Sequence, residues 1–363
     1  MGGKRVLVGM SGGIDSSVAA YILRQQGYDV SGITMRIRKP DSKHSGNSEK
    51  NSCFSASSEL NIEKAVQICS ALGIPHRIVD VSDLFERTVL ENFKSEYLNG
   101  RTPNPCVMCN QMIKFGAMVD LARKTGLEFD YFATGHYARI ERKNGRFALL
   151  KGKDEIKDQS YFLYRLSQKQ LSQTLFPLGE FTKEEIRKTD AELGLHPSEQ
   201  KESQDFYGGH YTELLDVQPQ EGEIVDTDGR VLGHHNGMWN YTVGQRKGLG
   251  ISAPYPLYVI DLDPVLNRVV VGYEEKTENS FVTADNINIV SLDPDSIENG
   301  RKMEASAKIR SASKPVQCVF RIEEGRLFAE FAHPVKAATC GQSIVIYDND
   351  TVLCGGIICR EKR

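Results

Sequence analysis

The sequence has no long apolar run, few cysteines and no excess of charge of either sign, and each shortage excludes a class of protein. Apolar stretches such as Val269–Val271 fall far short of the ~18–20 residues that a membrane-spanning helix needs. Eight cysteines in 363 residues are too few for a disulfide scaffold. The formal net charge of −3, from 45 basic and 48 acidic residues, gives no overall field that would hold a polyanion. A nucleic-acid partner would therefore need locally gathered basic groups.

The first residues lack a secretory signal, because Met1–Val8 lead directly into a predicted strand without an apolar region of about 7–15 residues. A cytoplasmic protein is therefore expected. Hydrophobic residues at 40%, charged residues at 26%, Gly 32 and Pro 13 are ordinary for globular chains and exclude collagen-like and wholly disordered proteins. At roughly 150 residues per domain, the length predicts two to three domains.

The first part of the chain alternates short apolar runs with helical patterns. Strands are predicted over residues 4–9, 28–36, 75–81 and 129–134. Helices are predicted over residues 15–26, 61–72, 83–97 and 111–125, and a loop over 99–110. This alternation is typical of a doubly wound α/β domain with a parallel sheet, which we place at residues 1–208.

The pattern changes after Gly208, where helical periodicity fades and turn signals such as Asn236-Gly237 separate short alternating segments. Strands are predicted over 316–322, 326–331 and 342–347. We expect a small central β-rich domain over 209–272 and an antiparallel barrel or sandwich over 273–363.

The strongest local signal is the run Gly9-Met10-Ser11-Gly12-Gly13-Ile14-Asp15-Ser16, which follows a predicted strand and opens a helix. Glycines let the backbone approach an anion, and serine hydroxyls and helix N-terminal amides donate hydrogen bonds to it. The run is neither a Walker motif nor a dinucleotide fingerprint. The alternative is a plain glycine turn capped by Ser or Asp. The run resembles the PP-loop, Ser-Gly-Gly-x-Asp-Ser, of ATP pyrophosphatases.

Further blocks narrow the resemblance. They are Thr102-Pro103-Asn104-Pro105-Cys106-Val107-Met108-Cys109-Asn110, Ile113-Lys114-Phe115, Ala133-Thr134-Gly135-His136-Tyr137, Lys157-Asp158-Gln159-Ser160, Glu202-Ser203-Gln204-Asp205 and Gly244-Gln245-Arg246-Lys247-Gly248. In this order the sequence resembles the tRNA-specific 2-thiouridylases (MnmA/TrmU family) over about residues 4 to 360. The resemblance implies a PP-loop domain, a small central domain and a C-terminal antiparallel β-barrel.

The resemblance also implies a sulfurtransferase that replaces the 2-oxygen of the wobble uridine of tRNA. ATP with Mg²⁺ would adenylate that oxygen, and sulfur from a donor protein or from sulfide would displace AMP. By motif, the ATP-binding residues would be Gly9, Met10, Ser11, Gly12, Gly13, Ile14, Asp15, Ser16, Met35 and Gly135. Asp15 would lie near the magnesium, and Met35 and Gly135 near adenine or ribose, although Met35 is equally explained as a core residue.

Cys109 matches the nucleophilic cysteine of the family, and a following helix N-terminus is expected to lower its pKa. Asn104, Pro105 and Cys106 would lie at the target base, in a pocket that Tyr207 would help to line. The tRNA contacts implied by the resemblance are His136, Lys157, Asp158, Gln159, Arg310, Ser311 and Gln342. Each of these also has the ordinary explanation of a solvated charge or a capped turn.

Two positions depart from the family pattern: Cys106 replaces an Asp, and Tyr207 replaces the second cysteine. The usual two-cysteine persulfide relay therefore cannot operate. Cys106 could instead resolve a persulfide on Cys109. Alternatively, Cys53, Cys106 and Cys109 could ligate a 4Fe-4S cluster, or less readily zinc. The plainest alternative leaves Cys106 as a spare thiol and Cys53 as a chance loop residue.

Two other functions stay open on the sequence. One is a PP-loop adenylating ligase that acts on a small metabolite, although nitrogen transfer would not need the Cys106/Cys109 pair. The other is a catalytically inert, ATP-regulated RNA-binding protein, suggested by the missing Asp and second cysteine. Release of pyrophosphate with tRNA would separate the inert protein from both enzymes, and sulfur incorporation would separate the thiolase from the ligase.

Overall fold

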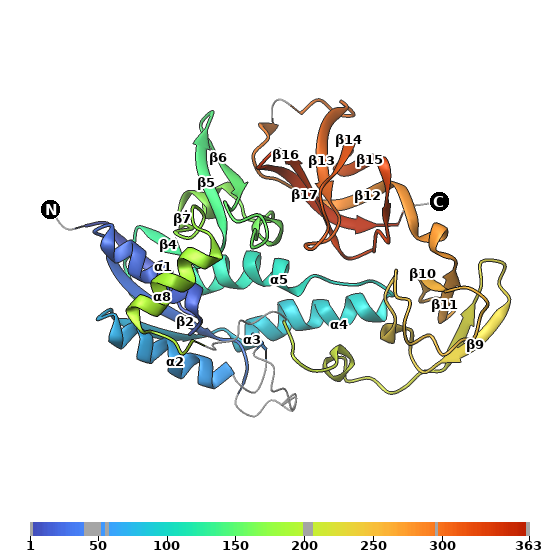
Figure 1. Cartoon of the computed structure of the whole chain (residues 1–363), viewed down its shortest axis with the longest axis horizontal. Helices are drawn as coiled ribbons and strands as arrows, with labels where there is room; N and C mark the ends of the chain where they lie inside the picture. Colours follow the sequence, from blue (N-terminus) through green and yellow to red (C-terminus); the bar gives the residue numbers. More distant parts are fainter. Residues whose placement is uncertain (1–2, 40–51, 55–57, 199–205, 295–296, 361–363) are drawn as a thin grey trace. The chain divides into compact units, whose positions relative to one another are not determined.

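The computed structural model describes residues 3–39, 52–54, 58–198, 206–294 and 297–360 (Figure 1). The chain forms two compact units. The first unit contains Met1–Val89, Pro105–Glu213 and Asp350–Val352, and the second contains Leu90–Asn104, Leu214–Asn349 and Leu353–Arg363. Among the described residues, no helix combines the length and the apolar character needed to cross a membrane.

A parallel five-stranded sheet forms the centre of the first unit. Its strands are β1 (Arg5–Gly9), β2 (Asp29–Arg36), β3 (His76–Asp80), β4 (Tyr131–Ala133) and β7 (Thr174–Leu175). The strand order β3-β2-β1-β4-β7 reverses direction between β1 and β4. Open α/β sheets bind ligands at the carboxyl ends of the strands that flank such a reversal. The predicted parallel-sheet fold is confirmed, and its topology places a site after β1 and β4.

Helix α1 (Ile14–Gln25) is buried on two sides, which explains its largely apolar middle. Ala20 and Leu23 pack with Val6 and Val8 of β1, and α2 (Ser58–Ala71) contributes to the same core. Val18 lies on the other side of α1, with Ile186 of α8 (Lys183–Leu193). Helices α8 and α2 therefore pack with different faces of α1.

The helix predicted over 111–125 begins earlier than expected. The helical run comprises α5 (Pro105–Met108), the π-helical η2 (Cys109–Ala117) and α6 (Met118–Lys124), so the predicted loop over 99–110 is wrong in its second half. Proline suits the first turn of a helix because it has no N–H to satisfy there and its φ is already helical. Cys106 and Cys109 are consequently three residues apart on a helix and share one face.

The helix predicted over 83–97 is also broken into parts. It consists of α3 (Ser82–Phe85), the π-helical η1 (Glu86–Leu90) and α4 (Glu91–Leu98). The hairpin of β5 (Ala138–Lys143) and β6 (Arg146–Lys151) turns at Asn144 and Gly145, whose φ values are 50° and 77°. These angles explain the Asn-Gly pair, which tolerates a positive φ at both positions. The remaining helices of the unit are η3 (Ser160–Phe162), α7 (Gln168–Ser172) and η4 (Tyr211–Leu214).

The second unit contains a small four-stranded sheet. Its strands are β8 (Gly222–Val225), β9 (Val231–His235), β10 (Tyr258–Asp263) and β11 (Arg268–Gly272), in the order β10-β11-β8-β9. Short helices η5 (Met238–Asn240) and η6 (Glu274–Thr277) flank the sheet in the sequence. Val259, Val269 and Val271 pack with Ile224 in its core. The alternating pattern in the sequence after Gly208 therefore corresponds to this β-sheet, as predicted.

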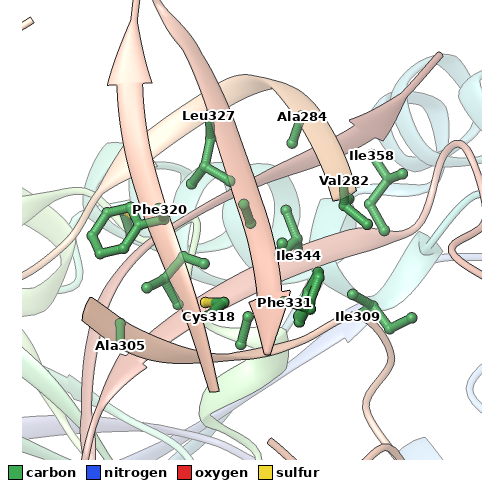
Figure 2. Packing of buried hydrophobic residues seen from close by; sticks show 14 of the residues in the cluster. Val282, Ala284, Ala305, Ile309, Cys318, Phe320, Leu327, Phe331, Ile344 and Ile358 are labelled. Carbon is green, nitrogen blue, oxygen red and sulfur yellow. The ribbon is translucent and has the colours of Figure 1, made fainter. Parts of the chain in front are cut away.

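Six antiparallel strands form a closed barrel at the end of the second unit. They are β12 (Glu278–Ile289), β13 (Met303–Lys308), β14 (Val316–Glu323), β15 (Arg326–Lys336), β16 (Ser343–Asp348) and β17 (Thr351–Cys359). Pairing of β12 with β17 closes the order β12-β15-β14-β13-β16-β17. Cys318, Phe320 and Ile322 alternate into the barrel core with Leu327 and Phe331 (Figure 2). The sequence left a barrel and a sandwich as alternatives, and the closed sheet shows that this part of the chain is a barrel.

Candidate active site

The turn between β1 and α1 presents an open helix N-terminus. The Ser11 N–H donates to Ser16 Oγ at 3.1 Å, and Ser16 Oγ donates to the Gly13 carbonyl at 3.0 Å. Among the described residues, no side chain caps the N-terminus of α1, whose N-cap residue is Gly13. The first amides of α1 therefore stay available to an anion. This geometry disfavours the alternative of a plain turn capped by Ser or Asp.

A cavity of about 270 Å³ lies beside this turn, within the first unit. Seven of the ten residues predicted to bind ATP line it: Gly9, Met10, Ser11, Asp15, Ser16, Met35 and Gly135. The other three, Gly12, Gly13 and Ile14, belong to the same turn but do not line the cavity. The carboxyl ends of β1, β2 and β4 thus converge on one space, as the strand order requires.

The charge around the cavity favours an anionic ligand. Among the described lining residues, Asp15 is the single carboxylate, whereas Arg36 and Lys114 are both cationic. Asp15 Oδ1 accepts hydrogen bonds from Lys183 Nζ at 2.7 Å and from Tyr137 Oη at 2.8 Å. Lys183 offsets the Asp15 charge, and Glu59 pairs with Arg36 at 2.9 Å, so the positive charge left on the cavity wall is that of Lys114.

Lys114 is a site residue that the sequence interpretation missed. Its Nζ lies 3.5 Å from His136 Nε2, and both residues line the cavity. An ammonium can only donate, so His136 Nε2 accepts and its Nδ1–H donates to Thr134 Oγ1 at 2.7 Å. Burial, helped by the Lys114 charge, holds the pKa of His136 well below its ordinary value. The Ile113-Lys114-Phe115 block was the available signal, but no role was assigned to it.

The two cysteines of the helical run do not line the cavity, whereas Cys53 is exposed and does. Burial raises the pKa of Cys109 to about 11, and the charge of Lys114 opposes this rise. The expectation that a helix N-terminus lowers the pKa of Cys109 is therefore wrong. The physical reason is that the helix begins at Pro105, so Cys109 lies a full turn inside it, away from the positive end of the dipole.

The residues proposed as cluster ligands are not arranged as a metal site. Among the described residues, which include Cys53, Cys106 and Cys109, no group of three or more Cys, His, Asp or Glu side chains could hold a metal ion. Cys53 precedes α2, while Cys106 and Cys109 lie on the helical run that starts at Pro105. These residues do not fit the predicted 4Fe-4S cluster or the weaker zinc alternative, and no reaction step below uses either.

Tyr207, at the position of the missing second cysteine, is packed into the first unit instead of lining the cavity. It is 2% exposed, and its hydroxyl donates to Glu213 Oε2 at 2.5 Å. Burial and the Glu213 carboxylate raise its pKa to about 12. The neighbouring Phe206 stacks on Phe54, and its carbonyl accepts the Phe54 N–H at 3.0 Å. This contact fixes the backbone next to Cys53.

The predicted tRNA contacts of the first unit fall into two groups. His136 and Gln159 line the cavity, and Gln159 Oε1 accepts the Tyr137 N–H at 3.0 Å. Lys157 and Asp158 lie outside it, in the turn before η3. Asp158 Oδ1 accepts the Ser160 N–H at 3.0 Å, and Asp158 Oδ2 accepts the Ser160 hydroxyl at 2.9 Å, so its carboxylate organises that turn.

The predicted tRNA contacts of the second unit have structural partners of their own. The Arg310 guanidinium donates to the Ala337 carbonyl at 2.8 Å and to Thr339 Oγ1 at 3.0 Å. Gln342 Nε2 donates to the carbonyls of Thr102 and Pro103 at 3.0 and 3.1 Å. Gln342 therefore holds the irregular segment that leads to Asn104. Ser311, next to Arg310, is exposed in a turn.

Comparison with known proteins identifies three consecutive family segments. They match a tRNA methyl transferase HUP domain over residues 4–207, a tRNA methyl transferase PRC-barrel domain over 214–273 and an aminomethyltransferase beta-barrel domain over 280–358. Among solved structures, a 4-thiouridine synthetase–RNA complex with bound ATP is 21% identical, with a TM-score of 0.34, over 53% of this chain and 41% of that one.

Curated relatives match almost the whole chain. The tRNA-specific 2-thiouridylase MnmA of Endomicrobium trichonymphae is 46% identical over 359 residues, covering 98% of each chain. The protein of the same name from Picosynechococcus sp. is 46% identical over 362 residues, again covering 98% of each chain. The chain therefore belongs to the family of the tRNA-specific 2-thiouridylases.

Proposed function

We propose that this protein is an ATP-dependent tRNA sulfurtransferase that thiolates the wobble uridine at C2. The observation that carries the proposal is the cavity beside the open N-terminus of α1, because its amides and cationic lining suit a triphosphate. Full-length similarity to enzymes named 2-thiouridylases supports the choice of uridine in tRNA as substrate. The metabolite ligase is less favoured, since it would not account for this similarity.

The reaction begins with activation of a poor leaving group. The C2 oxygen of the uridine attacks the α-phosphorus of ATP, which forms an adenylate and releases pyrophosphate. A sulfur nucleophile then adds to C2, and AMP departs with the original oxygen. Mg²⁺ would offset the phosphate charge when bound. Asp15, whose Oδ1 accepts from Lys183 Nζ, is the lining carboxylate that would lie near the ion.

Cys109 and Cys106 are proposed to deliver the sulfur. A sulfur-donor protein that carries a persulfide would transfer its outer sulfur to the Cys109 thiolate and leave with its own thiol reduced. The Cys109 persulfide would then be attacked at its inner sulfur by the Cys106 thiolate, which yields a Cys106–Cys109 disulfide and one equivalent of hydrosulfide. The hydrosulfide attacks C2, and a thiol reductant returns two electrons to the disulfide. Their spacing of three residues on one helical face supports this pairing. Asn104 and Pro105, which precede the pair, are proposed to lie at the target base.

The partners are proposed to be a tRNA with a wobble uridine and a sulfur-donor protein or free sulfide. Free sulfide would add to C2 directly, without the cysteine pair, because it cannot form a persulfide without an oxidant. His136, Lys157, Asp158, Gln159, Arg310, Ser311 and Gln342 stay proposed tRNA contacts. For Arg310 and Gln342, a tRNA contact has to coexist with the hydrogen bonds described above. A cytoplasmic location follows from the tRNA substrate, and we propose it on that ground.

The first test is release of pyrophosphate. With ATP, Mg²⁺ and unmodified tRNA, the protein should release pyrophosphate in a tRNA-dependent manner, and tRNA lacking the wobble uridine should not support release. No release with any tRNA would favour the inert RNA-binding protein. Release that ignores tRNA but responds to a small metabolite would favour the adenylating ligase.

A further inference from the structure

A buried histidine–aspartate pair lies behind the turn between β1 and α1. His196 Nδ1 lies 2.7 Å from Asp190 Oδ1, and the two side chains are 3% and 5% exposed. On the other side of the ring, His196 Nε2 lies 3.3 Å from the carbonyl oxygen of Gly12. Neither member of the pair is among the described residues that line the cavity. The pair therefore contacts the turn and not the space that a ligand would fill.

The two neighbours of the His196 ring determine where its hydrogens are. The Gly12 carbonyl can only accept a hydrogen bond, so His196 Nε2 must donate. His196 Nδ1 lies within hydrogen-bond distance of the Asp190 carboxyl group, which holds the ring in this orientation. Asp190 lies in the last turn of α8.

The end of α8 explains how the ring reaches both partners. Gly194 ends the helix with a left-handed φ of 62°, and its N–H is directed at the carbonyls of Ala191 and Asp190. This reversal of the chain brings residue 196 back beside residue 190. A buried hydrogen bond contributes little net stability, because it replaces hydrogen bonds to water. A role in positioning the turn is therefore a better account of the pair than a role in stability.

The same turn is restrained from its opposite side. Gly12 has a φ of +74°, and a Cβ added there would lie 2.4 Å from the Asn61 carbonyl of α2. A peptide plane holds its C=O and N–H in opposite directions. The hydrogen bond to the Gly12 carbonyl therefore also sets the direction of the Gly13 N–H, at the N-cap of α1.

We propose that His196, held by Asp190, is a positioning residue that fixes the Gly12–Gly13 peptide and so preorganises the turn for ATP. A turn that is already in its bound conformation loses less conformational entropy on binding. The inference rests on the proposed function only in taking ATP as the ligand of this turn. His196 lies outside the cavity and belongs to none of the sequence motifs described above.

Two substitutions separate the contact with Gly12 from the contact with Asp190. In His196→Asn the side-chain amide occupies the place of Nδ1, which retains a donor to Asp190 but does not reach Gly12. In His196→Gln the longer amide reaches the place of Nε2 and retains the donor to Gly12. Titration calorimetry with ATP alone and thermal melting of each ligand-free protein are the measurements. His234→Asn, an exposed position in β9, is the matched control.

His196→Asn should bind ATP about tenfold more weakly than the wild type, as expected for loss of one hydrogen bond. His196→Gln should stay within about threefold of the wild type, although both variants lose the ring. Equal ATP affinity in the two variants would overturn the inference and leave the proposed function standing. Losses of ATP affinity that merely follow the losses in melting temperature would do the same. If the wild type itself binds no ATP, the proposed function is overturned together with the inference.

Discussion

At the scale of single residues, Cys109 combines the role of proposed nucleophile with an environment that disfavours its thiolate. The pKa of about 11 means that a very small fraction of the thiol is ionised at pH 7. For Cys109 to react, either substrate binding has to change this environment or the sulfur has to arrive as a persulfide, which ionises more easily than a thiol. The resting enzyme should therefore be a poor target for alkylating reagents at Cys109.

Iodoacetamide should modify Cys109 slowly at pH 7, and the rate should rise about tenfold per pH unit up to pH 9.5, because only the thiolate reacts. Peptide mass spectrometry at a series of pH values measures this rate. The exposed Cys53 in the same sample reports on reagent quality and accessibility. A rate at Cys109 that is already constant above pH 8 would contradict the burial argument. Lys114→Met should slow the reaction further, since it removes the opposing cation.

His136 gives the second prediction at this scale. Its pKa is well below the ordinary value in the folded protein, because burial and then Lys114 disfavour the charged ring. The unfolded chain binds this proton near pH 6.5, so the free energy of unfolding should fall as the pH drops below about 6.5. The slope from this one group is at most about 1.4 kcal/mol per pH unit.

Urea denaturation of the wild type and of His136→Gln between pH 7.5 and 5.5 tests this prediction. The difference in free energy of unfolding between the two proteins should decrease as the pH falls, while the contributions of the carboxylates cancel in the subtraction. His234→Gln, at an exposed position, should show no such trend. A difference that does not vary with pH would show that His136 is not buried as a neutral ring.

At the scale of elements, the segment after β4 and the first turn of α1 are in close contact. A Cβ added at Gly135 would lie 2.7 Å from the Asp15 carbonyl carbon and 2.8 Å from the Ser16 amide nitrogen. Gly135→Ala should therefore displace the first turn of α1, at a cost of about 1–3 kcal/mol, and weaken ATP binding by at least tenfold. The reason is steric, since neither atom belongs to a flexible side chain.

Calorimetry with ATP and urea denaturation measure the two effects of Gly135→Ala. Gly233→Ala in β9 is the matched control, because its Cβ would meet only Ile251 Cγ1 at an ordinary 3.5 Å. The control should keep the wild-type affinity for ATP. Wild-type affinity in Gly135→Ala would show that the first turn of α1 tolerates displacement and does not form the nucleotide site.

The elements also show which parts of the site can be predicted from sequence. The turn after β1 was predictable, because its glycines and serines carry the phosphate chemistry locally. The helix at Pro105 was not, because Thr-Pro-Asn-Pro also fits a loop and only the structure shows that proline occupies a first turn. The ion pair of Lys183 with Asp15 joins positions 168 residues apart, and no local pattern reports such a contact. The same holds for His196 and Gly12.

At the scale of the whole molecule, the alternating pattern predicts β-strands in the C-terminal part, because a core face imposes alternation on each strand. The order of the strands and the closure by β12 and β17 depend on pairings between distant segments, which periodicity does not report. The division at residues 208/209 and 272/273 stays a prediction. Residues Leu90–Asn104 belong to the second unit although they lie between segments of the first, a feature that a linear search for boundaries does not detect.

The most direct test of the account is mass spectrometry of nucleosides after reaction of unmodified tRNA with ATP, Mg²⁺, a persulfide-carrying sulfur donor and a thiol reductant. The wild type should form 2-thiouridine at the wobble position, Cys109→Ser should form none, and Cys359→Ser, at the end of β17, should act like the wild type. Equal 2-thiouridine from the wild type and from Cys109→Ser, or none from the wild type, would contradict the central claim.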